Sequence, residues 1–76
     1  MKKIVVFGST GSIGSTLLNI VKKDKKNFKI LLLTANKNYK KIIKQAKIFN
    51  VKNIIIIDNI SFLIATKLLM NTKIFV

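Results

Sequence analysis

The chain has 76 residues, of which 50% are hydrophobic, 15 are basic and 2 are acidic, for a net charge of +13. Its length falls below the roughly 100–200 residues of an ordinary domain, which excludes a self-contained multidomain enzyme. Its apolar content excludes a disordered chain. There is no cysteine and no histidine, which excludes disulfide scaffolds, thiolate chemistry, zinc sites and imidazole acid–base catalysis.

The positive charge suggests binding to nucleic acid, because clustered cations release counterions from phosphate backbones. Every basic residue is Lys, however, and Arg, which binds guanine edges and phosphates through two parallel hydrogen bonds, does not occur. Ile, Lys and Asn make up about half of the chain, a bias that a genome rich in A and T explains. We therefore predict that the lysines form solvated helix faces and that the chain has no nucleic-acid partner.

The sequence shows no targeting or membrane-spanning segment. It begins like a signal peptide, with two lysines before an apolar run, but this run ends at Gly8, short of the ~7–15 residues of the apolar core of a signal peptide. No apolar stretch approaches the ~18 residues of a membrane span. We expect a cytoplasmic protein without a membrane partner.

Apolar β-rich runs alternate with segments of helical periodicity. The runs predict strands at residues 4–7, buried on both faces of a parallel sheet, 28–33, 54–57, also buried, and the start of a fourth strand at 73–76. The periodic segments predict helices at 12–23, 39–49 and, more weakly, 61–70. Residues 34–38 are expected to form a polar turn, and Asn50 to end the second helix.

This βαβαβα(β) order predicts an α/β fold with a Rossmann-like parallel sheet and right-handed crossovers, as an incomplete doubly wound domain. A chain that ends on an apolar strand would expose an unpaired edge, which folded proteins avoid. We therefore expect residues 1–76 to be the first part of a longer protein, or a truncated product of one.

Three glycines, Gly8, Gly11 and Gly14, lie between the first strand and the first helix, where a dinucleotide pyrophosphate binds in Rossmann-type folds. Gly8 permits a sharp turn out of the strand, and Gly11 removes a side chain where the backbone approaches phosphate. Gly14 lets the helix and strand pack closely. The spacing G-x-x-G-x-x-G is common among NADP-using folds and favours nucleotide binding over a purely structural turn.

The backbone amides from Thr10 to Ile13 are expected to point at the bound anion, together with the hydroxyl groups of Thr10 and Ser12. The positive end of the helix dipole would add to their attraction for phosphate.

The end of the second strand normally carries an Asp or Glu that binds the ribose 2′-hydroxyl of NAD. This chain has Thr34-Ala35-Asn36-Lys37-Asn38 there, a set of hydroxyl, amide and ammonium groups that suits a 2′-phosphate. The sequence therefore predicts NADPH over NADH, although Lys37 by itself is equally explained as one more solvated lysine.

Asp58, at the end of the third strand, is the only acid near this edge of the sheet. It is expected to be a turn or helix N-terminal residue, with Ser61 as a possible cap, rather than a catalytic group. Tyr39, Phe49 and Phe62 are expected to pack in the core or on helix faces.

Three stretches together resemble the N-terminus of 1-deoxy-D-xylulose 5-phosphate reductoisomerase: residues 1–14, residues 31–38 and residues 45–49. The resemblance covers most of residues 1–59. It implies an NADPH-dependent enzyme that also needs a divalent metal, Mg or Mn, and isomerises and reduces deoxyxylulose phosphate to 2-C-methyl-D-erythritol 4-phosphate in non-mevalonate isoprenoid biosynthesis. It also implies a homodimer and a sugar-phosphate substrate.

The resemblance implies NADPH contacts at Thr10, Gly11, Ser12, Ile13, Lys37 and Asn38. Asn36 departs from the small residue usual at its position in the family. With the motif glycines and neighbouring residues, the expected cofactor-binding set is Gly8, Thr10, Gly11, Ser12, Ile13, Gly14, Ala35, Asn36, Lys37 and Asn38. The resemblance thus implies that residues 1–76 are the N-terminal part of an NADPH-binding Rossmann-like domain, with the catalytic and C-terminal domains absent. The family's metal-binding carboxylates lie downstream, so this chain alone is expected to be inactive, with no catalytic or metal residue.

Two alternatives remain open at this point. The chain could be a fragment of another G-x-x-G-x-x-G dehydrogenase that uses NAD(P), or a small basic nucleotide-binding module that acts alone.

Overall fold

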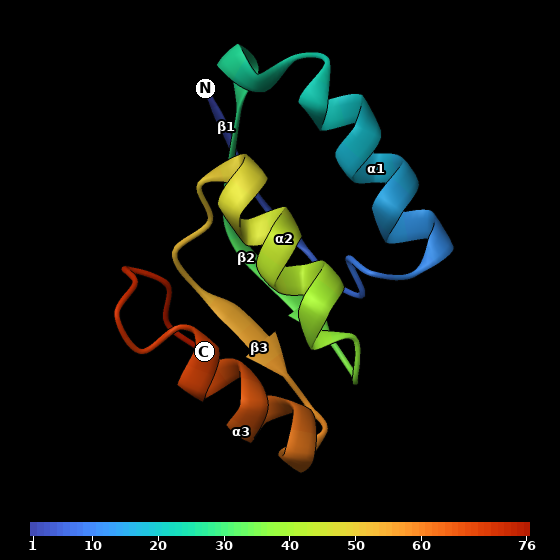
Figure 1. Ribbon diagram of the computed structural model, residues 1–76. Helices are drawn as coiled ribbons and strands as arrows, with labels where there is room; N and C mark the ends of the chain where they lie inside the picture. The colour runs from blue at the N-terminus through green and yellow to red at the C-terminus, as the bar shows by residue number, and fades with distance from the viewer.

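The computed structural model describes all 76 residues, which form three strands and three α-helices in alternation (Figure 1). The elements in chain order are β1 (Lys2–Val6), α1 (Ser12–Lys22), a short 3-10 helix (Lys25–Asn27), β2 (Phe28–Ala35), α2 (Tyr39–Phe49), β3 (Ile54–Ile56) and α3 (Asn59–Leu68). None of the helices is long and apolar enough to cross a membrane. The order confirms the predicted α/β fold.

The three strands are parallel and lie in the order β1-β2-β3. The C-terminal run adds to the outer side of β3, where the Ile54 amide donates to the Phe75 carbonyl at 2.8 Å and the Phe75 amide donates to the Lys52 carbonyl at 2.7 Å. Each crossover therefore extends the sheet in the same direction. Because such crossovers are right-handed, the three helices are placed on the same face of the sheet.

The hydrophobic core lies between this face of the sheet and the helices. In Figure 1, α2 lies across β2, and its buried residues pack against the strands and against α3. The fully buried side chains of the core include Leu33, Ile42, Ala46, Ile54 and Ala65. All of the lysines are exposed, as the sequence predicts for solvated faces.

The prediction that the first strand is buried on both faces is wrong, and so is the prediction that the third strand is buried along its whole length. Val5 is 41% exposed, Ile55 is 48% exposed, and Phe7 and Ile57 lie beyond the strand ends and are more exposed still. The reason is that the helices cover one face only, so alternate strand residues point away from them. The chain therefore carries an apolar sheet face that none of its own elements covers.

The strand and turn boundaries differ from the prediction at the end of β2. Thr34 and Ala35 continue the strand instead of starting a turn, because they pair with Ile55 and Ile56 of β3. The polar turn is consequently reduced to three residues, Asn36 to Asn38.

The helix ends follow local capping chemistry. Asn50 ends α2 in the left-handed conformation, with φ of 56°, as predicted for a stop residue. Asp58 is the N-cap of α3 and accepts hydrogen bonds from the amide and hydroxyl of Ser61; the cap is therefore Asp58 and not Ser61. Tyr39 and Phe49 are half-buried against the core, as expected.

Candidate nucleotide-binding site

A tight turn connects the carboxyl end of β1 to α1. Gly8 has a φ of +64°, a conformation that costs residues with a Cβ about 1–2 kcal/mol. The Gly11 amide donates to the Gly8 carbonyl at 3.0 Å, and the Ser15 amide donates to the Gly11 carbonyl at 2.9 Å, which starts the helix. The chain thus reverses within a few residues and directs the N-terminus of α1 toward the strand end.

Gly14 holds the helix against this turn. A Cβ at Gly14 would lie 2.3 Å from the Gly8 carbonyl oxygen and 2.7 Å from the Cα of Ser9, whereas a Cβ at Gly11 would lie 3.4 Å from the same oxygen. Only the absence of a side chain at Gly14 lets the helix approach so closely. The close packing expected for this glycine is present in the structure.

The turn and the first turn of α1 leave four backbone amides without an acceptor, those of Thr10, Ser12, Ile13 and Gly14. The Gly11 amide, which was also expected to be free, is used by the Gly8 carbonyl because the turn closes on itself. No side chain caps the helix. Unpaired amides at an uncapped helix N-terminus, together with the helix dipole, form a site for an anion.

The surface beside these amides is open and hollow. A depression of about 510 Å³ lies over the turn and the first turns of α1, lined by nine residues from the end of β1 to the middle of α1: Val5, Val6, Phe7, Gly8, Gly11, Ser12, Ile13, Gly14 and Leu17. The hydroxyls of Thr10 and Ser12 make no hydrogen bond within the chain. They are available to a ligand in the same place as the amides.

Ser9 anchors the turn, and sequence reasoning did not identify it. Its amide donates to the Thr34 carbonyl at 2.9 Å, and its hydroxyl donates to Gln45 Oε1 at 2.8 Å. Its carbonyl accepts from Gln45 Nε2 at 2.9 Å and from the Ser15 hydroxyl at 3.3 Å. The signal for Gln45 was present in the sequence as the one polar residue within the apolar stripe of α2.

The second candidate segment, Asn36 to Asn38, follows β2. The Asn38 side chain accepts from the Lys41 amide at 3.2 Å and so caps α2, while the Asn36 carbonyl accepts from the Asp58 amide at 3.0 Å. Asn36, Lys37 and Asn38 are exposed. Ala35 is only 3% exposed and its side chain faces the core, so the structure does not present that side chain to a ligand.

The two segments lie side by side at the carboxyl ends of the strands. Thr34 connects them, because its hydroxyl accepts from the Gly8 amide at 2.8 Å just before the polar segment begins. Lys41 of α2 reaches across, with its Nζ 3.0 Å from the Thr10 carbonyl oxygen. Lys41 is a further site residue that the sequence reasoning missed, because its place depends on how α2 packs.

The charges near the site favour an anion. Hydrogen bonds from the backbone amide and the hydroxyl of Ser61 lower the pKa of Asp58, with a smaller lowering from the nearby Lys37 ammonium and a partial opposing effect of desolvation. The only acid in the neighbourhood is therefore committed to capping α3. The Lys41 ammonium lies at the glycine turn, on the Thr10 carbonyl oxygen, and the Lys37 ammonium lies near Asp58.

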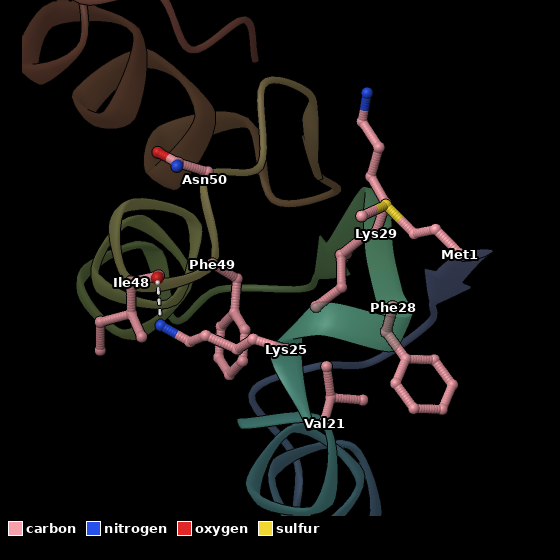
Figure 2. Close-up of a pocket in the computed structure, with 9 residues that line it drawn as sticks. Met1, Val21, Lys25, Phe28, Lys29, Ile48, Phe49 and Asn50 are labelled. Carbon is pink, nitrogen blue, oxygen red and sulfur yellow. Dashed lines mark hydrogen bonds between the residues drawn. The ribbon is translucent and has the colours of Figure 1, made fainter. Parts of the chain in front are cut away.

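A second hollow lies at the other end of the sheet. It has a volume of about 400 Å³ and lies among the start of β2, the end of α1 and the end of α2 (Figure 2). Lys25 spans it, with its Nζ 3.2 Å from the Ile48 carbonyl oxygen and 5.5 Å from the centre of the Phe49 ring. Ligands of open α/β sheets bind at the carboxyl ends of the strands, so the candidate site is the glycine turn.

The donor set of the chain does not fit a divalent cation. No group of three or more His, Cys, Asp or Glu side chains comes together in the structure, whereas Mg²⁺ and Ca²⁺ sites are built from several oxygen ligands.

Residues 4–76 match the family model of 1-deoxy-D-xylulose 5-phosphate reductoisomerase. Among curated relatives of that name, the chain is 72% identical over 74 residues to the protein of Pelagibacter ubique (strain HTCC1062) and 38% identical over 74 residues to that of Clostridium botulinum (strain 657 / Type Ba4). Each alignment covers 97% of this chain and 19% of the relative. The chain thus spans about a fifth of the length of these proteins.

Two solved structures share the fold. The reductoisomerase from Zymomonas mobilis, in complex with NADPH, superimposes with a TM-score of 0.89 at 29% identity, over 96% of this chain and 19% of that one. A DOX-P reductoisomerase in complex with NADPH, fosmidomycin and magnesium superimposes with a TM-score of 0.86 at 21% identity, over 93% and 17% of the two chains. The second likeness concerns the fold alone.

Proposed function

The chain belongs to the 1-deoxy-D-xylulose 5-phosphate reductoisomerase family, and we propose that it is the NADPH-binding N-terminal part of such an enzyme. The observation that carries this proposal is the set of four backbone amides without acceptors at the uncapped N-terminus of α1. They form a cradle for phosphate at the carboxyl end of β1, where a dinucleotide binds in this class of fold.

In this proposal the pyrophosphate of NADPH lies over the glycine turn. The amides of Thr10, Ser12 and Ile13 donate to its oxygens, and the hydroxyls of Thr10 and Ser12 add further donors. Gly11 contributes by having no side chain where the phosphate approaches, since its own amide is used within the turn. Gly8 and Gly14 maintain the shape of the turn.

The 2′-phosphate lies at the segment after β2. Lys37 supplies the ammonium group, and Asn36 and Asn38 supply amide donors from exposed positions. The side chain of Ala35 is buried, so Ala35 contributes only by placing the backbone from which Asn36 to Asn38 follow. The absence of an acid at the end of β2 removes the group that would repel a 2′-phosphate, which favours NADPH over NADH.

The complete enzyme would isomerise and reduce deoxyxylulose phosphate to 2-C-methyl-D-erythritol 4-phosphate in isoprenoid biosynthesis, as a cytoplasmic homodimer. Bound NADPH would supply the hydride for the reduction. The residues of this chain would bind and orient the cofactor and take no part in the rearrangement. The divalent metal that the reaction needs has no ligand set here, so its site and the catalytic groups belong to other parts of the enzyme.

A titration of the full-length protein that carries this chain, with NADPH and then NADH, tests the proposal. Nicotinamide fluorescence gives both dissociation constants. We expect NADPH to bind at least about tenfold more tightly, because hydrogen bonds to a charged phosphate contribute roughly 1.5–3 kcal/mol. Equal affinities, or no binding of either nucleotide, would contradict the proposal.

A further inference from the structure

Gln45 makes a paired contact with the glycine turn from the middle of α2. Its Oε1 accepts from the Ser9 hydroxyl at 2.8 Å, and its Nε2 donates to the Ser9 carbonyl at 2.9 Å. Ser9 is fully buried and Gln45 is nearly so. Both polar atoms of the Gln45 side-chain amide are hydrogen-bonded. No buried side-chain polar atom in the chain lacks a hydrogen-bond partner.

The contact fixes the residue between Gly8 and the first free amide of the turn. The Ser9 amide is already held by the Thr34 carbonyl at 2.9 Å, and its carbonyl also accepts from the Ser15 hydroxyl. Ser9 is thus tied to β2, to α1 and, through Gln45, to α2. Because Gly8, the residue before Ser9, has a positive φ and no side chain of its own to hold it, the orientation of the following amides depends on these ties.

The same helix carries the second segment of the site. Asn38 caps the N-terminus of α2 by accepting from the Lys41 amide at 3.2 Å, and the Lys41 ammonium lies 3.0 Å from the Thr10 carbonyl oxygen. Gln45 lies one helical turn beyond Lys41 on the same side of α2. One rigid helix therefore connects the segment after β2 to the turn after β1.

We propose that Gln45 is a positioning residue for the cofactor: acting through Ser9, it holds the phosphate turn in register with the 2′-phosphate segment at the start of α2. This inference rests on the proposed function. It predicts that loss of Gln45 weakens NADPH binding without any loss of a direct contact to the cofactor. A misplacement of about 1 Å in a binding group can cost a large factor in activity.

The test compares Gln45→Leu, which removes both hydrogen bonds at similar size, with Ile42→Val, a buried substitution on the same helix at a residue that makes no hydrogen bond to Ser9. Both are made in the full-length protein. We expect about tenfold weaker NADPH binding and a raised KM for NADPH in Gln45→Leu, with kcat changed much less, and unchanged binding in Ile42→Val. A merely structural role would lower the melting temperature of both variants and leave the NADPH affinity of both at the wild-type value.

Gln45→Glu gives a second measurement in case Gln45→Leu does not fold. It keeps the shape and the acceptor for the Ser9 hydroxyl but cannot donate to the Ser9 carbonyl when ionised. We expect it, too, to weaken NADPH binding. Wild-type affinity in a folded Gln45→Leu, or in Gln45→Glu at a pH at which its carboxylate is ionised, would overturn the proposal.

Hydrogen exchange of the Ser9 amide, measured without cofactor, separates this inference from the proposed function. We expect exchange about tenfold faster in the Gln45 variants than in Ile42→Val, since the turn loses its tie to α2. Unchanged exchange would overturn the positioning role even if NADPH binds. A wild-type protein with the protected Ser9 amide that fails to bind NADPH would instead overturn the proposed function.

Discussion

Replacement of Gly14 by Ala tests whether the close approach of α1 to the glycine turn matters for both stability and binding. The new Cβ would lie 2.3 Å from the Gly8 carbonyl oxygen, about 1 Å short of the 3.4 Å at which ordinary contact begins. The obstacle is backbone on both sides of the contact, so no flexible side chain can move aside. The helix and the turn must therefore separate by about this amount.

The size of the effect follows from two opposing contributions. Forced overpacking costs typically 1–3 kcal/mol, while Ala in place of Gly within a helix contributes about 1 kcal/mol of helix propensity. Because the obstacles are backbone atoms, the overpacking cost should lie in the upper part of its range, at about 2–3 kcal/mol, and we expect a net loss of about 1–2 kcal/mol in the free energy of unfolding. For a domain of 60–100 residues that corresponds to roughly 4–16 °C in melting temperature, and the shift is smaller in the longer full-length protein. Because the free amides move with the helix, NADPH affinity should fall by about ten- to a hundredfold.

Thermal unfolding and an NADPH titration of the full-length protein measure the two effects. Gly11→Ala is the matched control, because its Cβ would meet the same oxygen at 3.4 Å. It should leave the melting temperature near the wild-type value. If Gly14→Ala melts and binds NADPH like the wild type, the argument from close packing is refuted.

Three further outcomes are expected. Lys37→Ala should weaken NADPH binding about three- to tenfold and leave NADH binding unchanged, because an exposed ammonium contributes modestly to an ion pair; equal loss for both nucleotides would remove the role of Lys37 in recognising the 2′-phosphate. The pKa of Asp58 is lowered in the folded chain, chiefly by the hydrogen bond from the Ser61 amide. The stabilisation by the Asp58 carboxylate is therefore present above the ordinary carboxyl pKa of 3.8 and is lost as the pH falls through the lowered value. The melting temperature of Asp58→Asn should therefore change less with pH across this acid range than that of the wild type. Asn50 has a φ of 56°, so Asn50→Val should lower the free energy of unfolding by about 1–2 kcal/mol and Asn50→Gly should not, as measured by urea unfolding.

Local chemistry made the position of α2 predictable from the sequence. Its predicted bounds, 39–49, are the observed ones, because Asn38 provides a cap at one end and Asn50 a left-handed stop at the other. The family assignment likewise followed from contiguous residues, and the match over residues 4–76 rules in favour of this family over the alternative of another dehydrogenase family.

Long-range contacts decided what the sequence left open. The apolar runs of β1 and β3 are compatible with helices on both faces of the sheet or on one face only. The common direction of the crossovers places the helices on one face and leaves the other face exposed to solvent. Thr34 and Ala35 have the composition of a turn, yet pairing with β3 extends the strand through them.

The candidate site shows the same division. Three glycines at the right place predicted the turn, but which amides are free depends on how the turn closes on itself. Gly11 uses its amide internally, and Gly14 leaves its amide unpaired. The roles of Gln45 and Lys41 depend on how α2 packs beside the turn, and no local pattern carries that information.

The order β1-β2-β3, with further pairing at Phe75, means that consecutive loops at the carboxyl ends of the strands all lead toward the same side. In an open α/β sheet, the crevice for a ligand forms where two neighbouring loops diverge to opposite sides. Residues 1–76 contain no pair of neighbouring loops that diverge in this way. They therefore form only one side of the proposed nucleotide crevice, the side that carries the glycine turn. A strand that pairs with the free edge of β1 and crosses to the other face would build the opposite wall, and the complete crevice would then open beside β1.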